Sequence, residues 1–326
     1  DLIQYVYSGQ GCRLMLIGDT AQLPPVGEDE SPALCVDILK GYGMEVYEGM
    51  LTEVVRQLHD SGILYNATRL REIIYNGETD SLPMIRLSGF ADICRVSGEE
   101  LIEAIESSYN DAGTDETIVL CRSNKRANRF NAGIRRQVLY AEEEIESGDM
   151  LMVVKNNYHY TERIEDCPMS FIANGDIARL KRIRRFEELY GFRFANAVLE
   201  FADYDNTEIE CKVLLDTINS EAPSLTYDQS QKLFYEVEKD YEDIKSKIKR
   251  FKEIRENSYY NADQVKFSYA VTCHKAQGGQ WRAVFIDRFL FGEESMTKDM
   301  LRWLYTALTR ATERVFLVNF DDKFFE

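Results

Sequence analysis

A glutamine followed closely by two prolines, in the segment LMLIGDTAQLPPVG (residues 14–27), is the first candidate for chemistry. The prolines fix two φ angles and stiffen the chain, so the amide of Gln22 is presented with little freedom. A stiffly held neutral amide suits the sensing of a phosphate or the orientation of a water, as a glutamine does in GTPases. Gly18 and Asp19 follow an apolar run, and open α/β sheets bind ligands where strands end. An ordinary tight turn is the alternative.

The segment TCHKAQGGQW (residues 272–281) gathers a hydroxyl, an imidazole, an ammonium and amides beside two glycines. Glycines let the backbone approach a ligand closely, and such side chains can grip phosphates or a sugar-phosphate backbone. A helix beginning at Thr272 is the alternative, but Gly278-Gly279 would interrupt it within two turns.

The segment YTALTRATERVFLV (residues 305–318) places Arg310 at the predicted end of a helix, just before a strand. An arginine in that position can reach a phosphate, and such an arginine finger contributes roughly 10³ to 10⁵ in rate where it operates. A solvent-facing salt bridge is the usual explanation for a lone arginine and stays open as the alternative.

The elements that must position these residues read as an α/β sheet. Continuous apolar strands that alternate with helices are typical of a parallel sheet covered on both faces. The predicted strands are 14–17, 44–47, 117–120, 267–271, 283–286 and 314–318. One predicted helix ends near residue 6, and a short one follows the two prolines. Three longer helices are predicted at 51–77, 125–138 and 300–309.

The pattern changes between residues 146 and 263. Short strands of β-type composition, separated by turn signals, predict a small β-barrel inserted into the α/β unit. These strands are 149–155, 176–183, 195–201 and 209–215. Apolar residues spaced three and four apart from Phe234 to Phe251 then predict one helix. We favour packing of this helix on its own domain over a coiled-coil dimer.

Composition bounds the function. The sequence has 326 residues, 44% of them hydrophobic, and a net charge of −17, which counts against nucleic acid as a partner. Two basic clusters, CRSNKRANRFNAGIRR (121–136) and RLKRIRRF (179–186), qualify that sum, although a charge run is usually a solvated face. The seven scattered cysteines predict reduced, mostly buried thiols and no metal site built from side chains. No apolar run approaches the length of a membrane span, so we expect a cytoplasmic protein with no membrane partner.

Together the three segments resemble superfamily 1 helicases, most closely the RecD-like branch. GDTAQLPPVG resembles motif III of that family, TCHKAQGG its motif V and YTALTRA its motif VI, in the right order. LTEVVRQ (51–57) resembles the segment that supplies another phosphate-facing arginine, here Arg56. GDMLMVVKNNY and FIANGDIARL resemble the opening of an inserted SH3-like barrel. The resemblance covers nearly the whole chain.

This resemblance implies a RecA-like P-loop NTPase-type parallel sheet with an inserted small SH3-like β-barrel. Residues 1–45 would be the remnant of a first RecA-like motor domain, 46–145 and 264–326 a second one, and 146–263 the barrel with an accessory helix. ATP would bind between the motor domains, with single-stranded DNA crossing both.

The resemblance also implies residue roles. Gln22 would couple the γ-phosphate to DNA, and Arg56 and Arg310 would be arginine fingers; these three are the catalytic candidates. The candidates for contact with ATP are Gly18, Asp19, Gln22, Arg56, Gly278 and Arg310. The candidates for contact with nucleic acid are Arg122, Ser123, Asn124, Thr272, His274, Lys275 and Gln277. Tyr158 and Phe171 would either stack on bases or, as we favour, pack in the barrel core.

Two departures from the family pattern stand out. Gln280 occupies the place of a commonly acidic residue thought to hold the ribose, and neither G-x-x-x-x-G-K-[ST] nor a strand ending in Asp-Glu occurs. We therefore expect the main elements for the cofactors, ATP and Mg²⁺, to lie upstream of Asp1, and the chain alone to be inactive. The expected whole is an ATP-dependent DNA helicase moving 5′ to 3′, with single-stranded DNA, duplex junctions and recombination or repair proteins as partners. The alternative is a non-motor DNA-binding or scaffolding module of a helicase-nuclease complex.

Overall fold

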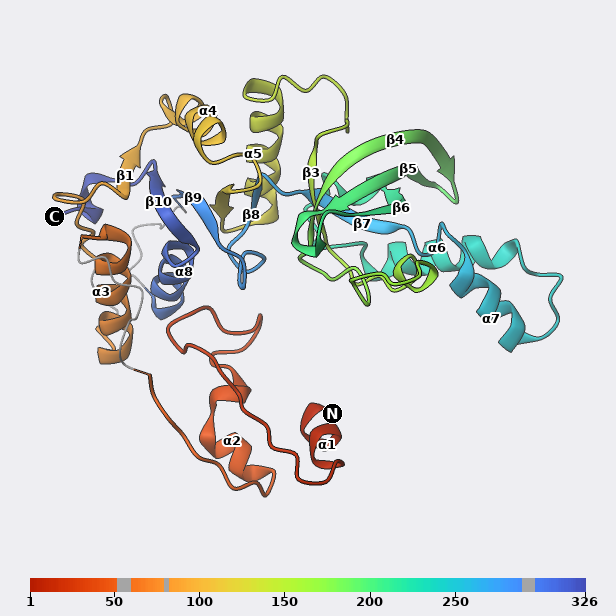
Figure 1. The fold of residues 1–326 in the computed structure, drawn as a ribbon, viewed down its shortest axis with the longest axis horizontal. Coiled ribbons are helices and arrows are strands. Elements are labelled where there is room, and N and C mark those ends of the chain that lie inside the picture. Colours follow the sequence, from red (N-terminus) through yellow and green to blue (C-terminus); the bar gives the residue numbers. More distant parts are fainter. Residues whose placement is uncertain (52–59, 79–81, 289–296) are drawn as a thin grey trace. The chain divides into compact units, whose positions relative to one another are not determined.

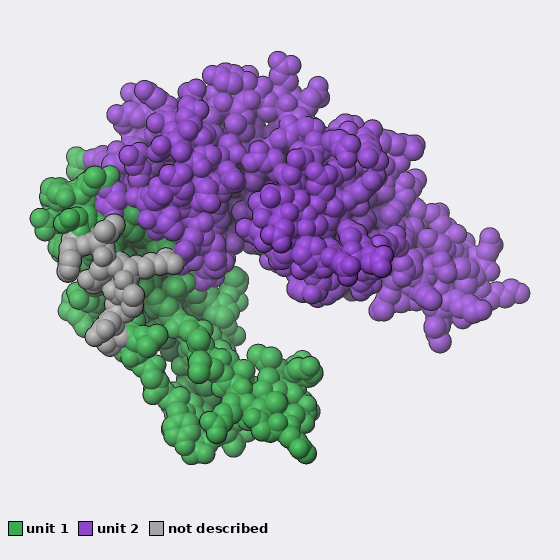
Figure 2. All heavy atoms as spheres, in the orientation of Figure 1, with its two compact units in different colours: residues 1–91, 291–309, 322–326 green, residues 92–290, 310–321 purple. Residues whose placement is uncertain are grey.

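The computed structural model describes residues 1–51, 60–78, 82–288 and 297–326 (Figure 1). They fall into two units, which Figure 2 shows in different colours. Unit 1 is drawn from residues 1–91, 291–309 and 322–326, and unit 2 from residues 92–290 and 310–321.

Unit 2 contains a five-stranded sheet in which every neighbouring pair is parallel. Its strands, in spatial order, are β1 (Ile93–Val96), β10 (Ala311–Val318), β9 (Trp281–Asp287), β2 (Thr117–Cys121) and β8 (Ala270–Thr272). All five residues of β2 are buried, as expected of a central parallel strand. Helices α4 (Leu101–Asp111) and α5 (Asn124–Gln137) pack against β2. The predicted α/β class with a parallel sheet is confirmed, while β1 and α4 were not predicted.

A closed five-stranded barrel is inserted into unit 2 between α5 and β8, as predicted (Figure 1). Its strands are β3 (Met150–Val153), β4 (Ile177–Leu189), β5 (Phe192–Phe201), β6 (Thr207–Leu214) and β7 (Asp263–Phe267). Sequence patterning located the first four. The fifth was missed, because the predicted strand 267–271 is two strands: β7 closes the barrel up to Phe267, and β8 joins the sheet from Ala270.

The prediction of one helix from Phe234 to Phe251 is wrong. Two helices, α6 (Tyr227–Lys239) and α7 (Lys247–Glu256), are joined by a turn, and the hydroxyl of Ser246 caps α7 by accepting from the amide of Lys249. The rings of Phe234 and Phe251 lie 5.7 Å apart between centroids. The apolar spacing therefore encodes two helices that pack on each other.

Unit 1 contains α1 (Leu2–Tyr7), α2 (Val36–Gly41), α3 (Gly62–Asn76) and α8 (Lys298–Leu308), and α3 packs on α8. Gly77 ends α3 in the left-handed conformation, with φ 71°, as its position predicts. The strands predicted at 14–17 and 44–47 are absent. No described segment pairs with them, and Met15, Ile17 and Tyr47 are more than four-fifths exposed.

The seven cysteines all lie in described ranges and form no disulfide. Only Cys121, Cys211 and Cys273 are buried, so the prediction of mostly buried thiols is wrong. Within the described ranges, no helix is both long and apolar enough to cross a membrane.

Candidate nucleotide and nucleic-acid site

The Gln22 segment is a turn held by its own aspartate. The amide of Ala21 donates to Asp19 Oδ1 at 3.0 Å, and the amide of Gln22 donates to the Asp19 carbonyl at 3.1 Å. An aspartate side chain that bonds the backbone two residues on makes an Asx turn. Ala21 is fully buried, whereas Gln22 stays partly accessible. The prediction of a strand end at this point is wrong, and a side-chain-stabilised loop presents the glutamine instead.

Two residues of the YTALTRA segment hold this loop within unit 1. The amide of Leu23 donates to Thr306 Oγ1 at 2.9 Å, and the Tyr305 hydroxyl donates to Asp19 Oδ2 at 2.7 Å. Thr306 is completely buried. Burial, and then the hydrogen bond to Asp19, raise the pKa of Tyr305 well above its usual range, so the hydroxyl stays a donor. Sequence reasoning had assigned Asp19 to ATP contact. In the structure both of its carboxylate oxygens accept hydrogen bonds that hold the loop.

Arg302 adds a third connection from α8. Its Nε donates to the Thr20 carbonyl at 3.1 Å and its Nη1 to the Asp29 carbonyl at 2.6 Å. The residue is only 3% exposed. Sequence reasoning missed Arg302 and the roles of Tyr305 and Thr306. The only signal in the sequence was the presence of polar side chains in an otherwise apolar helix. The structure shows that every position from Leu301 to Leu308 is buried.

Arg310, which follows α8 in the YTALTRA segment, belongs to unit 2. It is 7% exposed, so it is not a solvent-facing ion pair, and its Nη1 donates to the Gly279 carbonyl at 3.1 Å. The amide of Trp281 donates back to the Arg310 carbonyl at 3.0 Å. A Cβ added at Gly279 would lie 2.4 Å from the Trp281 ring, so only glycine fits under that ring. Arg310 is therefore built into the TCHKAQGG loop.

That loop is a series of turns and not a helix, as the two glycines predict. The amides of Lys275 and Ala276 donate to the Thr272 carbonyl at 2.9 and 3.2 Å, and Gly278 has a left-handed φ of 89°. His274 and Gln277 are exposed, and desolvation by surrounding atoms lowers the pKa of His274 below its usual range. The imidazole is therefore neutral near pH 7.

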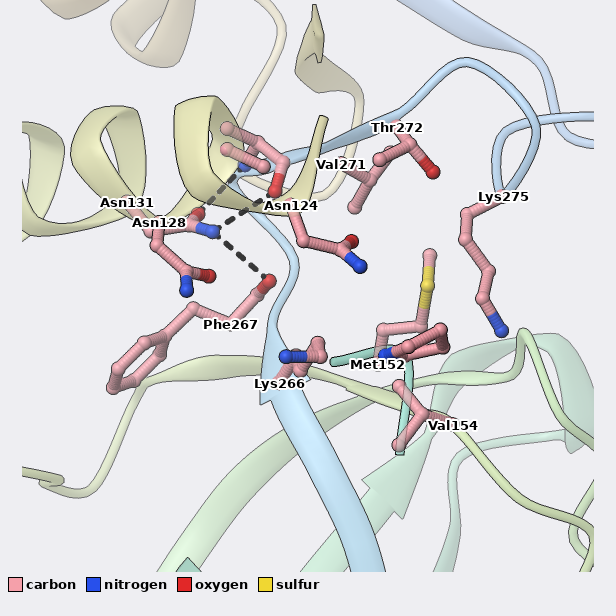
Figure 3. Close-up of a pocket in the computed structure, with 13 residues that line it drawn as sticks. Asn124, Asn128, Asn131, Met152, Val154, Lys266, Phe267, Val271, Thr272 and Lys275 are labelled. Atoms are coloured by element: carbon pink, nitrogen blue, oxygen red, sulfur yellow. Dashed lines mark hydrogen bonds between the residues drawn. The ribbon is translucent and has the colours of Figure 1, made fainter. Parts of the chain in front are cut away.

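Three predicted nucleic-acid residues, Asn124, Thr272 and Lys275, line one pocket of unit 2 (Figure 3). The pocket lies between two sets of elements. Helix α5 and the sheet strand β8 line one side, and the barrel strands β3 and β7 line the other. Of its thirteen lining residues, two are lysines and none is acidic. The structure thus gathers these three candidates around one pocket whose charged lining residues are both cationic.

The second lysine, Lys266, was missed by sequence reasoning. Its Nζ donates to the carbonyls of Thr217, at 3.2 Å, and Ser220. Burial, and then the charge of Lys275, lower the pKa of Lys266 to about 8. A lysine alternating with apolar residues in the segment QVKF was the only signal.

The basic cluster 121–136 is not one nucleic-acid face. Arg126 forms a bidentate ion pair with Asp287 at 2.7 and 2.8 Å, and the buried Arg135 pairs with Asp149 at 2.8 and 2.9 Å. The hydroxyl of Ser123 caps α5, so this predicted contact has a structural role. The exposed arginines of the cluster are Arg122, Arg129 and Arg136.

The second basic cluster lies on β4 and is largely neutralised within the barrel. Ion pairs join its side chains to carboxylates of β4, β5 and β6. These pairs are Lys181–Glu200, Arg184–Glu210 and Arg185–Glu187. The solvated-face interpretation holds for this run.

The predicted ATP contacts divide between the units. Gly18, Asp19 and Gln22 lie in unit 1, and Gly278 and Arg310 in unit 2. Arg56 lies outside the described residues.

Residues 267–318 match the family described as UvrD-like helicase C-terminal domain. This stretch is similar to the C-terminal region of superfamily 1 helicases. It contains the pocket residues Thr272 and Lys275 and the whole of the segment YTALTRATERVFLV (residues 305–318). A comparison with curated proteins finds no match.

Solved structures of Pif1 helicases are similar to this chain at low identity. The Bacteroides enzyme in complex with ADP-AlF3 and ssDNA has a TM-score of 0.44 and 13% identity, over 99% of this chain and 67% of that one. The Candida albicans enzyme has a TM-score of 0.35 and 15% identity, over 95% and 65%. A structure of two coordinating Pif1 helicases at forked dsDNA gives 0.42 and 14%, over 94% and 60%. The chain thus spans about 60 to 67% of the length of these proteins.

Proposed function

We propose that this chain is the C-terminal portion of an ATP-dependent DNA helicase or translocase of the RecD-like branch, which moves 5′ to 3′ along single-stranded DNA. The observation that carries the proposal is the hydrogen bonding of residues 305–310. Tyr305 and Thr306 hold the loop that presents Gln22, and Arg310 holds the TCHKAQGG loop. One short segment therefore supports both loops that a motor of this kind needs.

The residues present fit part of an ATP site. Arg310 keeps its cationic group largely out of water, where its interaction with a phosphate is least screened, and Gly278 leaves backbone open to a close approach. ATP, when bound, supplies the phosphoanhydride bond that is hydrolysed. Because the 326 residues contain no G-x-x-x-x-G-K-[ST], we propose that other parts of the protein supply the main phosphate and Mg²⁺ contacts.

Gln22, in unit 1, would orient a water or sense a phosphate, and Arg310, in unit 2, would stabilise negative charge. Asp19 has both carboxylate oxygens engaged by Ala21 and Tyr305, so we assign it to positioning of Gln22 and not to ATP. The neutral imidazole of His274 can donate or accept one hydrogen bond without adding charge.

Single-stranded DNA would contact the pocket shared by Asn124, Thr272 and Lys275. Its two lysines and lack of acidic lining favour a phosphate despite the net charge of −17. Duplex junctions and repair proteins remain proposed partners of the complete protein.

The test is ATP hydrolysis by the complete protein, with and without single-stranded DNA. We expect DNA to stimulate hydrolysis in the wild type and Arg310→Ala to lower kcat by roughly 10³-fold or more, with nucleotide binding retained. Arg314→Ala is the matched control, because Arg314 lies on β10, which begins directly after Arg310, its side chain is 59% exposed, and it forms a 3.9 Å ion pair with Asp111. Its activity should equal that of the wild type.

If Arg310→Ala retains DNA-stimulated hydrolysis, the role of Arg310 in stabilising negative charge is refuted. Absence of stimulation in the wild type would instead favour a scaffolding module. Duplexes with a single 5′ or 3′ tail then test polarity, since only the 5′-tailed substrate should be unwound.

A further inference from the structure

Two aromatic rings on the barrel remain unused by the proposed function. Tyr158 and Phe171 lie in the connection between β3 and β4, and their rings stack with centroids 4.8 Å apart and an interplanar angle of 28°. Tyr158 is 52% exposed, so the favoured interpretation from sequence, core packing, is wrong for this residue. Phe171 is half-buried and supports the exposed ring from behind.

The backbone beneath these rings is firmly held. Asn157 and Ile172 exchange two backbone hydrogen bonds, at 2.9 and 2.8 Å, which sets Tyr158 opposite Phe171. The side-chain amide of the buried Asn157 donates to the Asn261 carbonyl and to Asp263 Oδ1. The hydroxyl of Thr161 donates to the Tyr158 carbonyl. A flat exposed surface on a fixed backbone loses little entropy when it binds a partner.

The same connection is joined to the pocket that Asn124, Thr272 and Lys275 line. Lys275 donates from Nζ to Asn174 Oδ1, and the amide of Asn174 donates to Asn156 Oδ1 at 2.7 Å. Asn156 precedes the residue that pairs with Ile172, and the exposed Lys155 is its neighbour. A short hydrogen-bonded path therefore links the ring pair to the lysine that lines the pocket.

An exposed aromatic surface on a segment that also carries Lys155 and is hydrogen-bonded to Lys275 has the chemistry of a single-stranded nucleic-acid contact. Bases stack on such rings whatever their identity, while neighbouring cations neutralise the phosphates. We propose that the outer face of Tyr158, supported by Phe171, stacks on an unpaired base of a nucleic acid whose adjacent phosphate is bound at Lys275. This inference rests on the proposed function and names a contact on the barrel for its substrate.

The experiment measures the affinity of the complete protein for an oligodeoxythymidine at several salt concentrations. We expect Tyr158→Ala to weaken binding by about 5-fold or more, the lower end of the effect of losing one stacked base, with an unchanged slope of log K against log salt. Tyr158→Trp should retain or improve the affinity. Lys275→Gln should weaken binding and reduce the slope by about 1, because it removes one phosphate contact.

Tyr227→Ala is the control, because Tyr227 is 78% exposed on α6 of the same unit. It should bind like the wild type. A second readout uses oligonucleotides carrying 5-iodouracil, whose photochemical cross-link requires close stacking; mass spectrometry should locate the cross-link at Tyr158 or Phe171.

The outcomes separate the two proposals. If the wild type binds and is stimulated by DNA but Tyr158→Ala behaves like Tyr227→Ala, the stacking contact is refuted and the motor function stands. Cross-links confined to other residues refute it equally. If the wild type binds no single-stranded DNA, both proposals fail.

Discussion

Replacing Asp263 by asparagine should make the barrel more stable at pH 8 but not at pH 4. Asp263 begins β7 and is fully enclosed. Its Oδ1 accepts from Asn157 at 2.6 Å, while Oδ2 has no hydrogen-bond partner among the described residues. Burial raises the pKa of Asp263 from 3.8 to about 7, against the lowering effects of the neighbouring Cys211 thiol and of the Asn157 amide.

The sign follows from proton binding. Between pH 4 and pH 7 the unfolded chain loses the Asp263 proton while the folded barrel keeps it, so the free energy of unfolding falls as the pH rises. At about 1.4 kcal/mol per pH unit, the loss between pH 5 and pH 7 is about 3 kcal/mol as an upper bound. Burial lowers the pKa of the neighbouring His159, whose contribution has the opposite sign because its charging destabilises the barrel as the pH falls below 6.5.

Asparagine keeps an acceptor for Asn157 but places an NH₂ where Oδ2 was, at a cost of about 1 to 3 kcal/mol for a buried donor without a partner. That cost does not depend on pH. The advantage of Asp263→Asn over the wild type should therefore grow by about 2 to 3 kcal/mol between pH 5 and pH 8. His159 is present in both proteins, so its contribution cancels in this difference.

Hydrogen exchange of peptides from β6 and β7, corrected for the intrinsic pH dependence of exchange, measures the local stability of the barrel. A difference between variant and wild type that is constant from pH 5 to pH 8 would refute the assignment of the raised pKa to Asp263. A difference that shrinks as the pH rises would show that the sign is wrong.

Three further substitutions test individual contacts. Thr306→Val removes the acceptor of the Leu23 amide and should destabilise the Gln22 loop by about 1 to 3 kcal/mol, seen as faster exchange of that amide. Gly279→Ala should displace the Trp281 ring, which a Cβ would meet at 2.4 Å, and this is detectable as a change in tryptophan fluorescence; an unchanged spectrum would contradict the close packing. Lys266→Met removes a buried cation and should weaken DNA binding more at pH 7 than at pH 9, because the pKa of Lys266 is about 8; equal weakening at both pH values would argue against a charged contact.

The strands that were predicted correctly from the sequence are those that other elements bury. The segments at 117–120, 283–286 and 314–318 are strands at nearly the expected residues, because continuous apolar runs are what a covered parallel sheet requires. Residues 14–17 have an equally apolar run, yet Met15 and Ile17 are 82% and 84% exposed. An apolar run therefore predicts a strand only where a neighbouring strand is available to pair with it.

The candidate site was predictable in its motifs but not in its contacts. Spacing singled out Gln22, Thr272 and Arg310, whereas the side chains that hold their loops, Arg302 and Tyr305, look like ordinary members of an apolar helix. Their partners are backbone carbonyls and a carboxylate more than 270 residues away in sequence, which periodicity cannot indicate. Likewise Lys266 is identifiable as a buried cation only once β7 is known to border the pocket.

Residues 305–310 suggest how the two loops could respond together. Thr306 bonds the Gln22 loop and Arg310 bonds the TCHKAQGG loop, and only three residues separate them in a continuous chain. Coupling requires an element whose arrangement both sites bias, and the end of α8 is the candidate. If it transmits, Thr306→Val should change hydrogen exchange in residues 272–281 as well as near Leu23. If the two contacts act separately, the effect should stay confined to the Gln22 loop, and the proposed motor function would need another route between Gln22 and Arg310.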